Sequence, residues 1–277
     1  MITTIQSFQR ICLLLLGVAF ISLAGCNKEE ESFMATEVRL TGFNNTGEEL
    51  EIQIDTIIYK NSRYYEKPTS FYPDEYIPFS FAYLYYSADN PVLTLKGKTT
   101  GKIYLEQPIK KGVLRQRYGF TYVNGENVYN PPAPDPNTNK VGFFLADPLF
   151  KDAIDIVAKT SIYISNPDGS STIKEEKMVL VKDLKPFQWK YVDYTPQSMF
   201  ASPDIYRIEL SYYKSGTDII AFPTGSEYTE NNEIDLTKKE KSTFPVLDQR
   251  GRVVSYLISI EKIRENDFIK QFSAVDW

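Results

Sequence analysis

The stretch VRLTGFNNTGEELEIQIDTIIY, residues 38–59, decides the fold, because two runs of alternating apolar and polar residues flank a polar turn. A period of two is typical of half-buried β-strands, whose successive side chains point to opposite faces. We predict strands over 37–45 and 48–59, joined by a turn in which Gly47 adopts a positive φ. Three apolar side chains would share one face of the second strand: Leu50, Ile52 and Ile54.

Similar runs continue along the chain, with turn residues about every 8 to 12 positions, as in antiparallel sandwiches. Hairpins are expected over 92–109, and over 118–129 around Asn124-Gly125, the dipeptide that type I′ turns favour. Two further turns are expected, at Asn166–Gly169 and at Arg250-Gly251. The pattern predicts an all-β fold.

Composition agrees with strands. Aromatic residues make up 14% of the chain, with 20 tyrosines and 17 phenylalanines, and such side chains fit pleated surfaces. One short helix is expected over 263–272, because four apolar residues there share a helical face. These are Ile263, Phe268, Ile269 and Phe272.

A proline-rich segment divides the chain. NPPAPDPNTNK (130–140) has four prolines in eleven residues and almost no apolar side chains, which is typical of a linker. We predict a first β-sandwich module over 37–130, a linker over 131–140, and a second module over 141–277 that ends in the short helical tail.

The two modules resemble each other. VGFFLADPLFKDAIDIVAKTSIYI (141–164) is similar in pattern to 38–59, and 207–220 matches 92–105 at a constant offset of 115. The offset pairs Leu93 with Ile208, Leu95 with Leu210, Gly101 with Gly216, and Leu105 with Ile220. Amphipathic strands can resemble one another by chance, but the shared order favours a duplicated β-module.

The first 25 residues have the layout of a secretory signal. Arg10 precedes a thirteen-residue apolar run, Ile11–Leu23, which is shorter than the roughly 20 residues that span a bilayer. Leu23-Ala24-Gly25-Cys26 then resembles the lipobox of bacterial lipoproteins, which implies cleavage before Cys26 and acylation of its thiol. The other cysteine, Cys12, would leave with the signal, so acylation explains an otherwise unpaired exported thiol.

An acidic tether is expected over 26–36. Like charges resist packing, so Lys28 and the three glutamates Glu29, Glu30 and Glu31 are consistent with a solvated spacer. Lys-Glu-Glu after the lipidated cysteine also resembles the export signal of surface lipoproteins of Bacteroidota-type bacteria. That resemblance implies a lipid-anchored protein of the outer membrane that faces the cell exterior. The strands resemble the immunoglobulin-like or transthyretin-like repeats common in that class.

Residue usage excludes several functions. The chain has no histidine, which rules out Ser-His-Asp and Cys-His nucleophiles, H-E-x-x-H zinc sites and histidine-ligated haem. The net charge of −5 argues against nucleic acid as a partner. Neither a G-x-S-x-G elbow nor a glycine-rich phosphate loop is present, so we expect no enzyme, cofactor or metal.

An aromatic loop is the candidate binding surface. Five rings lie among charges and prolines, a mixture typical of binding surfaces, although such a loop can also fold back onto its own module. They are Tyr64, Tyr65, Phe71, Tyr72 and Tyr76. A second aromatic face, Phe79 to Tyr85 on one strand, is either a sugar-stacking platform or core, and core is favoured.

Other candidates are weaker. Asp135, Asn137 and Asn139 alternate as in an EF-hand loop, but Lys140 replaces the required glycine. Carboxylate pairs such as Asp152 with Asp155, or Glu48 with Glu49, have the chemistry of a glycosidase, yet an acidic chain has such pairs by number alone.

The sequence therefore predicts a non-catalytic binding or accessory lipoprotein, for example in glycan or nutrient capture beside a TonB-dependent transporter. An adhesion or envelope-assembly protein that binds other proteins is the alternative. A carboxylate-based hydrolase is the residual one.

Overall fold

The fold is taken from a computed structural model of the chain, which describes residues 34–276 with several gaps. The gaps are 56, 60–69, 86–90, 147–149, 201–206, 222–232, 236–243 and 264–265. Within the described residues the sole helix is α2 (Pro196–Met199), and no helix there is long and apolar enough to cross a membrane. The all-β prediction is confirmed.

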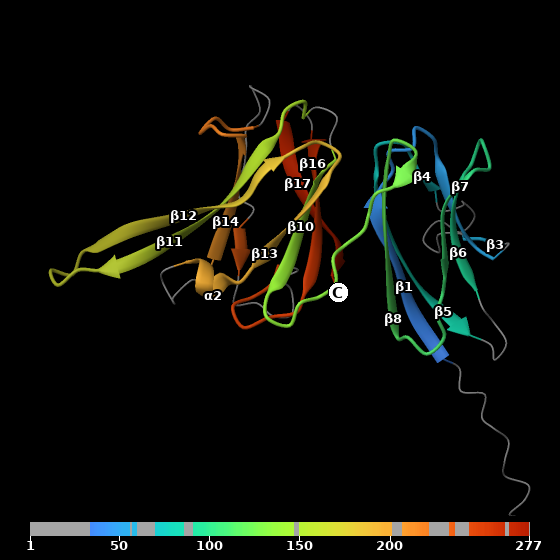
Figure 1. The fold of residues 1–277 in the computed structure, drawn as a ribbon, viewed down its shortest axis with the longest axis horizontal. Coiled ribbons are helices and arrows are strands. Elements are labelled where there is room, and N and C mark those ends of the chain that lie inside the picture. Colours follow the sequence, from blue (N-terminus) through green and yellow to red (C-terminus); the bar gives the residue numbers. More distant parts are fainter. Residues whose placement is uncertain are drawn as a thin grey trace, which may run out of the picture.

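The strands before the proline-rich segment form two sheets (Figure 1). The first has the order β5-β1-β8-β9, and the second has the order β3-β2-β6-β7 with β4 against β2. Their bounds are β1 (Met34–Phe43), β2 (Leu50–Ile54), β3 (Ile57–Ile58), β4 (Ser70–Phe71), β5 (Tyr76–Tyr85), β6 (Val92–Gly97), β7 (Ile103–Pro108), β8 (Arg115–Val123) and β9 (Glu126–Asn127).

The later strands form two further sheets, with the orders β13-β10-β16-β17 and β12-β11-β14-β15. Their bounds are β10 (Asn139–Leu145), β11 (Ile154–Ser165), β12 (Ser171–Leu184), β13 (Trp189–Tyr194), β14 (Arg207–Lys214), β15 (Glu233–Asp235), β16 (Val253–Ile263) and β17 (Asn266–Asp276).

Both halves have one topology. In each, the first strand pairs antiparallel with a middle strand and parallel with a late one: β1 with β5 and β8, and β10 with β13 and β16. The second strand, β2 or β11, lies in the other sheet. A constant-type immunoglobulin domain instead pairs its first two strands in one sheet, so the strand order here differs from that type.

In this topology the two strands of residues 38–59 belong to different sheets. The predicted turn is present, with Gly47 at φ 80°, but β1 and β2 do not pair with each other. The turn carries the chain from one sheet to the other. The hairpins β6–β7 and β8–β9 are confirmed, and both Asn124 and Gly125 have positive φ, as a type I′ turn requires.

The predicted C-terminal helical tail is wrong. Residues 266–276 form β17, which pairs antiparallel with β16. Apolar residues at 268, 269 and 272 suit a helical face, yet β16 is eleven residues long and needs a partner for its backbone groups. That long-range requirement outweighs the local pattern.

Each sandwich has its own apolar core. Burial alternates along β2, so that Leu50, Ile52 and Ile54 face inward as predicted. Phe79 and Phe81 lie in the same core at 5% and 8% exposure, which confirms the core interpretation for these two rings. Tyr83 is partly buried against that core, and the Tyr85 side chain lies outside the described residues. The second module buries Val141, Phe143, Ile156, Ile208 and Leu210, among others, in a separate cluster.

A third apolar cluster joins the modules, which lie side by side in Figure 1. Phe43 at the end of β1 packs in one cluster with Phe144 and Leu257 of the second module. Trp189 lies against them, with its ring 5.2 Å from Phe144 and 5.3 Å from Tyr129. The two sandwiches therefore share a buried seam.

Two tyrosine hydroxyls meet at the same buried serine beside this seam. Tyr129, from the first half, and Tyr191, from β13, share hydrogen bonds with the Ser255 hydroxyl at 3.2 and 2.9 Å. Their rings lie flat on Gly119 and Gly142, where an added Cβ would come within 2.1 and 2.3 Å of ring carbons. Glycine at both positions gives the rings their room.

We predict that Phe144→Ala lowers the free energy of unfolding by about 3–5 kcal/mol, the usual cost of deleting a buried phenylalanine. Urea denaturation measures the loss. The control Leu114→Ala, at a residue 81% exposed, should stay within about 0.5 kcal/mol of wild type. Equal effects of the two substitutions would show that the seam contributes nothing.

Candidate functional site

The candidate site is built around Asp155, the second residue of β11. Its side chain lies on the sheet face opposite to Ile154 and Ile156, which enter the core. The pairing of β11 with β12 shifts register on both sides of Ile156, as at a β-bulge. A bulge leaves backbone groups without ladder partners. Asp155 supplies one, because its Oδ1 accepts the Asp183 N–H at 2.8 Å.

The same carboxylate holds the turn that follows β14. Its Oδ1 also accepts the Ser215 hydroxyl, and its Oδ2 accepts the Gly216 N–H, both at 2.9 Å. Gly216 has φ 72°, a conformation that glycine adopts without steric cost. One buried carboxylate therefore ties β11, the bulge of β12 and the turn after β14 together.

Asp155 is ionised at neutral pH. Burial raises its pKa, but the amides of Asp183 and Gly216, the Ser215 hydroxyl and the charge of Lys182 together lower the pKa below its ordinary value of 3.8. A general acid of a glycosidase needs a raised pKa instead. The carboxylate thus serves as a structural acceptor.

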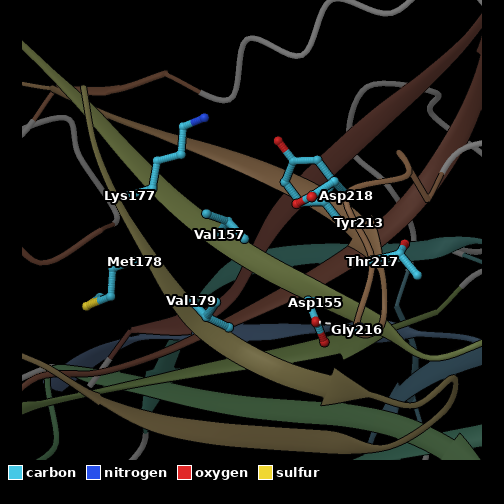
Figure 2. A pocket seen from close by; sticks show the side chains of 9 residues that line it. All are labelled: Asp155, Val157, Lys177, Met178, Val179, Tyr213, Gly216, Thr217 and Asp218. Carbon is cyan, nitrogen blue, oxygen red and sulfur yellow. Dashed lines mark hydrogen bonds between the residues drawn. The ribbon is translucent and has the colours of Figure 1, made fainter. Parts of the chain in front are cut away.

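An open pocket of about 370 Å³ lies beside this clamp, on the outer face of β11, β12 and β14. Figure 2 shows Val157 between the side chains of Lys177 and Tyr213. The strand register is consistent with this view, because Val157 pairs with Val179 on β12 and with Ser211 on β14. Lys177 and Tyr213 are two residues from these partners on the same two strands. Thr217 and Asp218 line the pocket from the turn that Asp155 holds.

The lining combines three kinds of group. Val157, Met178 and Val179 supply apolar surface, and Val179 is 54% exposed. Tyr213 supplies a half-buried ring, with the Lys159 ammonium 5.4 Å from its centroid. The polar groups are an ammonium donor, a hydroxyl and a carboxylate acceptor, from Lys177, Thr217 and Asp218. Small-molecule sites commonly have this composition and volumes of about 300–1,000 Å³.

The first module has a counterpart of the clamp. Glu48 accepts the Thr100 hydroxyl at 2.7 Å and the Thr100 N–H at 3.2 Å, and Tyr104 donates its hydroxyl to the same carboxylate. The bond from Tyr104 is the main cause that lowers the pKa of Glu48. In turn, burial and the contact with Glu48 raise the pKa of Tyr104 to about 12.

The offset of 115 therefore has a structural basis. The hydroxyls of Thr100 and Ser215 both donate to the carboxylate that holds their turn. The next residues, Gly101 and Gly216, both have positive φ. Leu93 with Ile208 and Leu95 with Leu210 are buried pairs. The fourth pair departs from the repeat, because Leu105 is buried whereas Ile220 is 41% exposed.

The residues predicted for anchoring and export lie outside the described residues, namely Cys26, Lys28, Glu29, Glu30 and Glu31. So do Tyr64 and Tyr65 of the aromatic loop. The remaining three rings of that loop lie in three different environments. The loop therefore does not bring them together on one surface.

Phe71 is 7% exposed and belongs to the core of the first module, so it is unavailable for ligand stacking. Tyr76 packs into the seam between the modules, where burial raises its pKa to about 12. Tyr72 is 57% exposed and remains a candidate. Phe71 and Tyr76 are corrections to the predicted binding surface, since strands β4 and β5 turn both rings inward.

No local pattern in the sequence indicates the pocket residues Lys177, Tyr213, Thr217 and Asp218. The one usable indication was the repeat, which places the turn at Gly216 where Gly101 stands in the first module. The predicted pairing of Asp155 with Asp152 as catalytic carboxylates is wrong for Asp155, whose partners are backbone and hydroxyl donors. Nothing local in the sequence indicates the bulge of β12.

Within the described part of the chain, no group of three or more acidic or cysteine side chains could bind a metal ion. Asn139, once compared with a calcium ligand, is fully buried and donates to the carbonyls of Tyr194 and Gln249. No family model matches the chain, and no curated protein is similar to it. The functional proposal rests on the residues themselves.

We predict that Asp155→Asn lowers the free energy of unfolding at pH 7 by about 1.5–3 kcal/mol, because hydrogen bonds to a charged acceptor are lost. The folded-state pKa lies below the unfolded one, so the stabilisation is present above about pH 4 and is lost as the pH falls further. Denaturation curves from pH 7 to pH 3 measure both effects.

The matched control is Asp152→Asn, at an exposed residue three positions earlier. The difference between wild type and Asp155→Asn should shrink at acid pH, whereas the control should follow wild type throughout. A difference that is absent at pH 7, or that grows on acidification, would contradict the clamp.

Proposed function

We propose that this protein is a lipid-anchored protein of the outer membrane, facing the exterior, that acts as a non-catalytic binding module in glycan or nutrient capture. The observation that carries the proposal is the pocket on the outer face of β11, β12 and β14, which joins a tyrosine ring and apolar side chains to hydrogen-bonding groups. A TonB-dependent transporter beside it would take up the captured ligand.

A sugar ring suits this lining. The C–H face of a pyranose is apolar and packs against an aromatic ring or valine side chains, here Tyr213, Val157 and Val179. Its hydroxyls both donate and accept, which matches Lys177, Thr217 and Asp218. The pocket is open, so an extended chain could cross it rather than be enclosed.

Binding is favoured over hydrolysis at this pocket. A carboxylate-based glycosidase needs one carboxyl whose pKa is raised so that it can protonate the leaving oxygen. Asp155 has a lowered pKa and gives its oxygens to three protein donors. The buried carboxylate of Asp155 thus stabilises the strands and the turn that form the pocket, and it does not act on a ligand.

We expect Tyr213→Ala to weaken retention on a polysaccharide panel by about 1–3 kcal/mol, by analogy with the stacking of bases on aromatic side chains. Affinity electrophoresis of the folded chain measures the loss. Tyr72→Ala, at the exposed ring of the first module, is the matched comparison and should bind as wild type does. A loss that follows Tyr72 would move the site to the first module, and no binding by wild type would refute glycan capture.

Anchoring through Cys26 is supported by the lipobox at Leu23–Cys26 and by the short apolar run before it. Two or more acyl chains bind a membrane firmly, because each buried CH₂ contributes about 0.8 kcal/mol. The acidic residues 29–31 would then keep the start of the mature chain hydrated and direct its export. The sandwiches would stand outside the bilayer on this tether.

Cys26→Ser should abolish incorporation of labelled palmitate and release the protein from the membrane fraction. Cys12→Ser is the control, because Cys12 lies in the segment expected to be cleaved, and it should keep both label and membrane association. Metabolic labelling with fractionation gives the result. Label that persists in Cys26→Ser would refute the anchor.

A second function, adhesion or envelope assembly through protein contacts, is favoured by the β11–β12 hairpin. This hairpin extends as an arm beyond the sandwich in Figure 1. Among the described residues the equivalent strand of the first module, β3, has two residues, whereas β12 has fourteen. An extension on a duplicated frame is a place where function resides.

A further inference from the structure

The arm has one open strand edge. β11 pairs with β14 from Ile154 to Lys159, and beyond that point its only partner among the described strands is β12. Thr160 is still covered on that side, since it is 4% exposed and its hydroxyl donates to the Arg207 carbonyl of β14. From Ser161 to Ser165 the other edge of β11 has no strand partner among the described residues. Such an edge is a template for pairing with another strand.

The two edges of the arm differ in charge. β12 carries the consecutive charged residues Lys174, Glu175, Glu176 and Lys177 along its outer edge, which is a device that blunts edge pairing. The open edge of β11, Ser161–Ser165, has the sequence SIYIS and carries no charge. It has the β-branched and aromatic residues that favour strands, and neither Pro nor Gly.

The open edge also reads the same in both directions. Residues 161–165 are Ser-Ile-Tyr-Ile-Ser, a palindrome centred on Tyr163. An antiparallel pair of two copies about a two-fold axis at Tyr163 would place tyrosine beside tyrosine, isoleucine beside isoleucine and serine beside serine. A two-fold interface must be self-complementary in just this way.

Exposed apolar side chains fit that pairing. Tyr163 and Ile173 face each other across the hairpin and are 72% and 56% exposed, and Ile164 is 44% exposed. Pairing two arms would align Ile173, Tyr163 and their two counterparts in one strip across four strands. Lys159 already pairs with Glu209 of β14, so the new pairing would stop at residues 161–165, none of which is charged.

We infer that the β11 edge of the arm is a self-association surface, on which a second copy of this chain adds its own residues 161–165 antiparallel in a four-stranded sheet. The contact is small, and it suits proteins held together on one membrane better than dilute monomers. It is independent of the pocket and of any glycan.

Cysteine cross-linking of the full chain in native membranes tests the register. Tyr163→Cys should give a disulfide-linked dimer on mild oxidation, because the two-fold axis brings residue 163 of each copy together. Ser161→Cys alone should not, since residue 161 would lie four residues, about 13 Å, from its own counterpart. A disulfide needs Cα atoms within about 7 Å.

Co-expression of Ser161→Cys with Ser165→Cys copies should restore the dimer, because those positions face each other. Leu114→Cys, 81% exposed on the other module, measures random collision, and wild type measures any contribution from Cys26. We expect at least a tenfold excess of dimer for Tyr163→Cys and for the mixed pair over these controls. All three arm substitutions are at surface positions, so the fold is retained.

Three results would overturn the inference. The first is a dimer yield for Tyr163→Cys no higher than for Leu114→Cys. The second is cross-linking of Ser161→Cys alone as efficiently as the mixed pair, which would mean a different register. The third is a cross-linked product that mass spectrometry identifies as a different protein joined to this chain.

Discussion

The carboxylate of Asp155 makes three hydrogen bonds on which the distinctive half of this molecule depends. It takes up the amide that the β12 bulge leaves free, and it fixes the turn after β14 through Ser215 and Gly216. Asp155 itself lines the pocket, and the β11–β12 arm continues the same two strands beyond Lys159. Losing the charge would weaken the bonds to all three donors, and a hydrogen bond to a charged group contributes about 1.5–3 kcal/mol.

The first module shows the same device in a simpler form. Glu48 holds the turn at Thr100, and the strand that corresponds to β12, β3, has two residues in the described part of the chain. A duplicated sandwich whose turn is held by an acid therefore serves as a frame in both halves. The second half adds the bulge, the pocket and the arm to that frame, while the seam at Phe43, Phe144 and Leu257 keeps the halves together.

Much of this frame could be predicted from local pattern, because alternation and turn chemistry are encoded within a few residues. The burial of Leu50, Ile52 and Ile54 and the positive φ of Gly101 and Gly216 follow from such patterns. The pairing partner of each strand does not follow from local pattern, because an alternating strand can pair equally well with any other alternating strand. Thus the turn between β1 and β2 was predicted, but local pattern does not reveal that the two strands lie in different sheets, and it favoured a helix over 263–272 where β17 forms.

The candidate site was harder to predict for the same reason. Phe71 and Tyr76 stand among charges and prolines, yet long-range packing places one in the core and the other in the seam. Lys177, Tyr213 and Asp218 come from strands and a turn that meet only after folding. Their assembly depends on the bulge that Asp155 stabilises.

Residue-resolved amide hydrogen exchange tests this dependence most directly. At one fixed neutral pH, the amides of Asp183 and Gly216 should be strongly protected in wild type and should exchange much faster in Asp155→Asn, while amides of β1 and β8 keep their rates. Equal protection of Asp183 and Gly216 in the two proteins would contradict the central role given to this carboxylate.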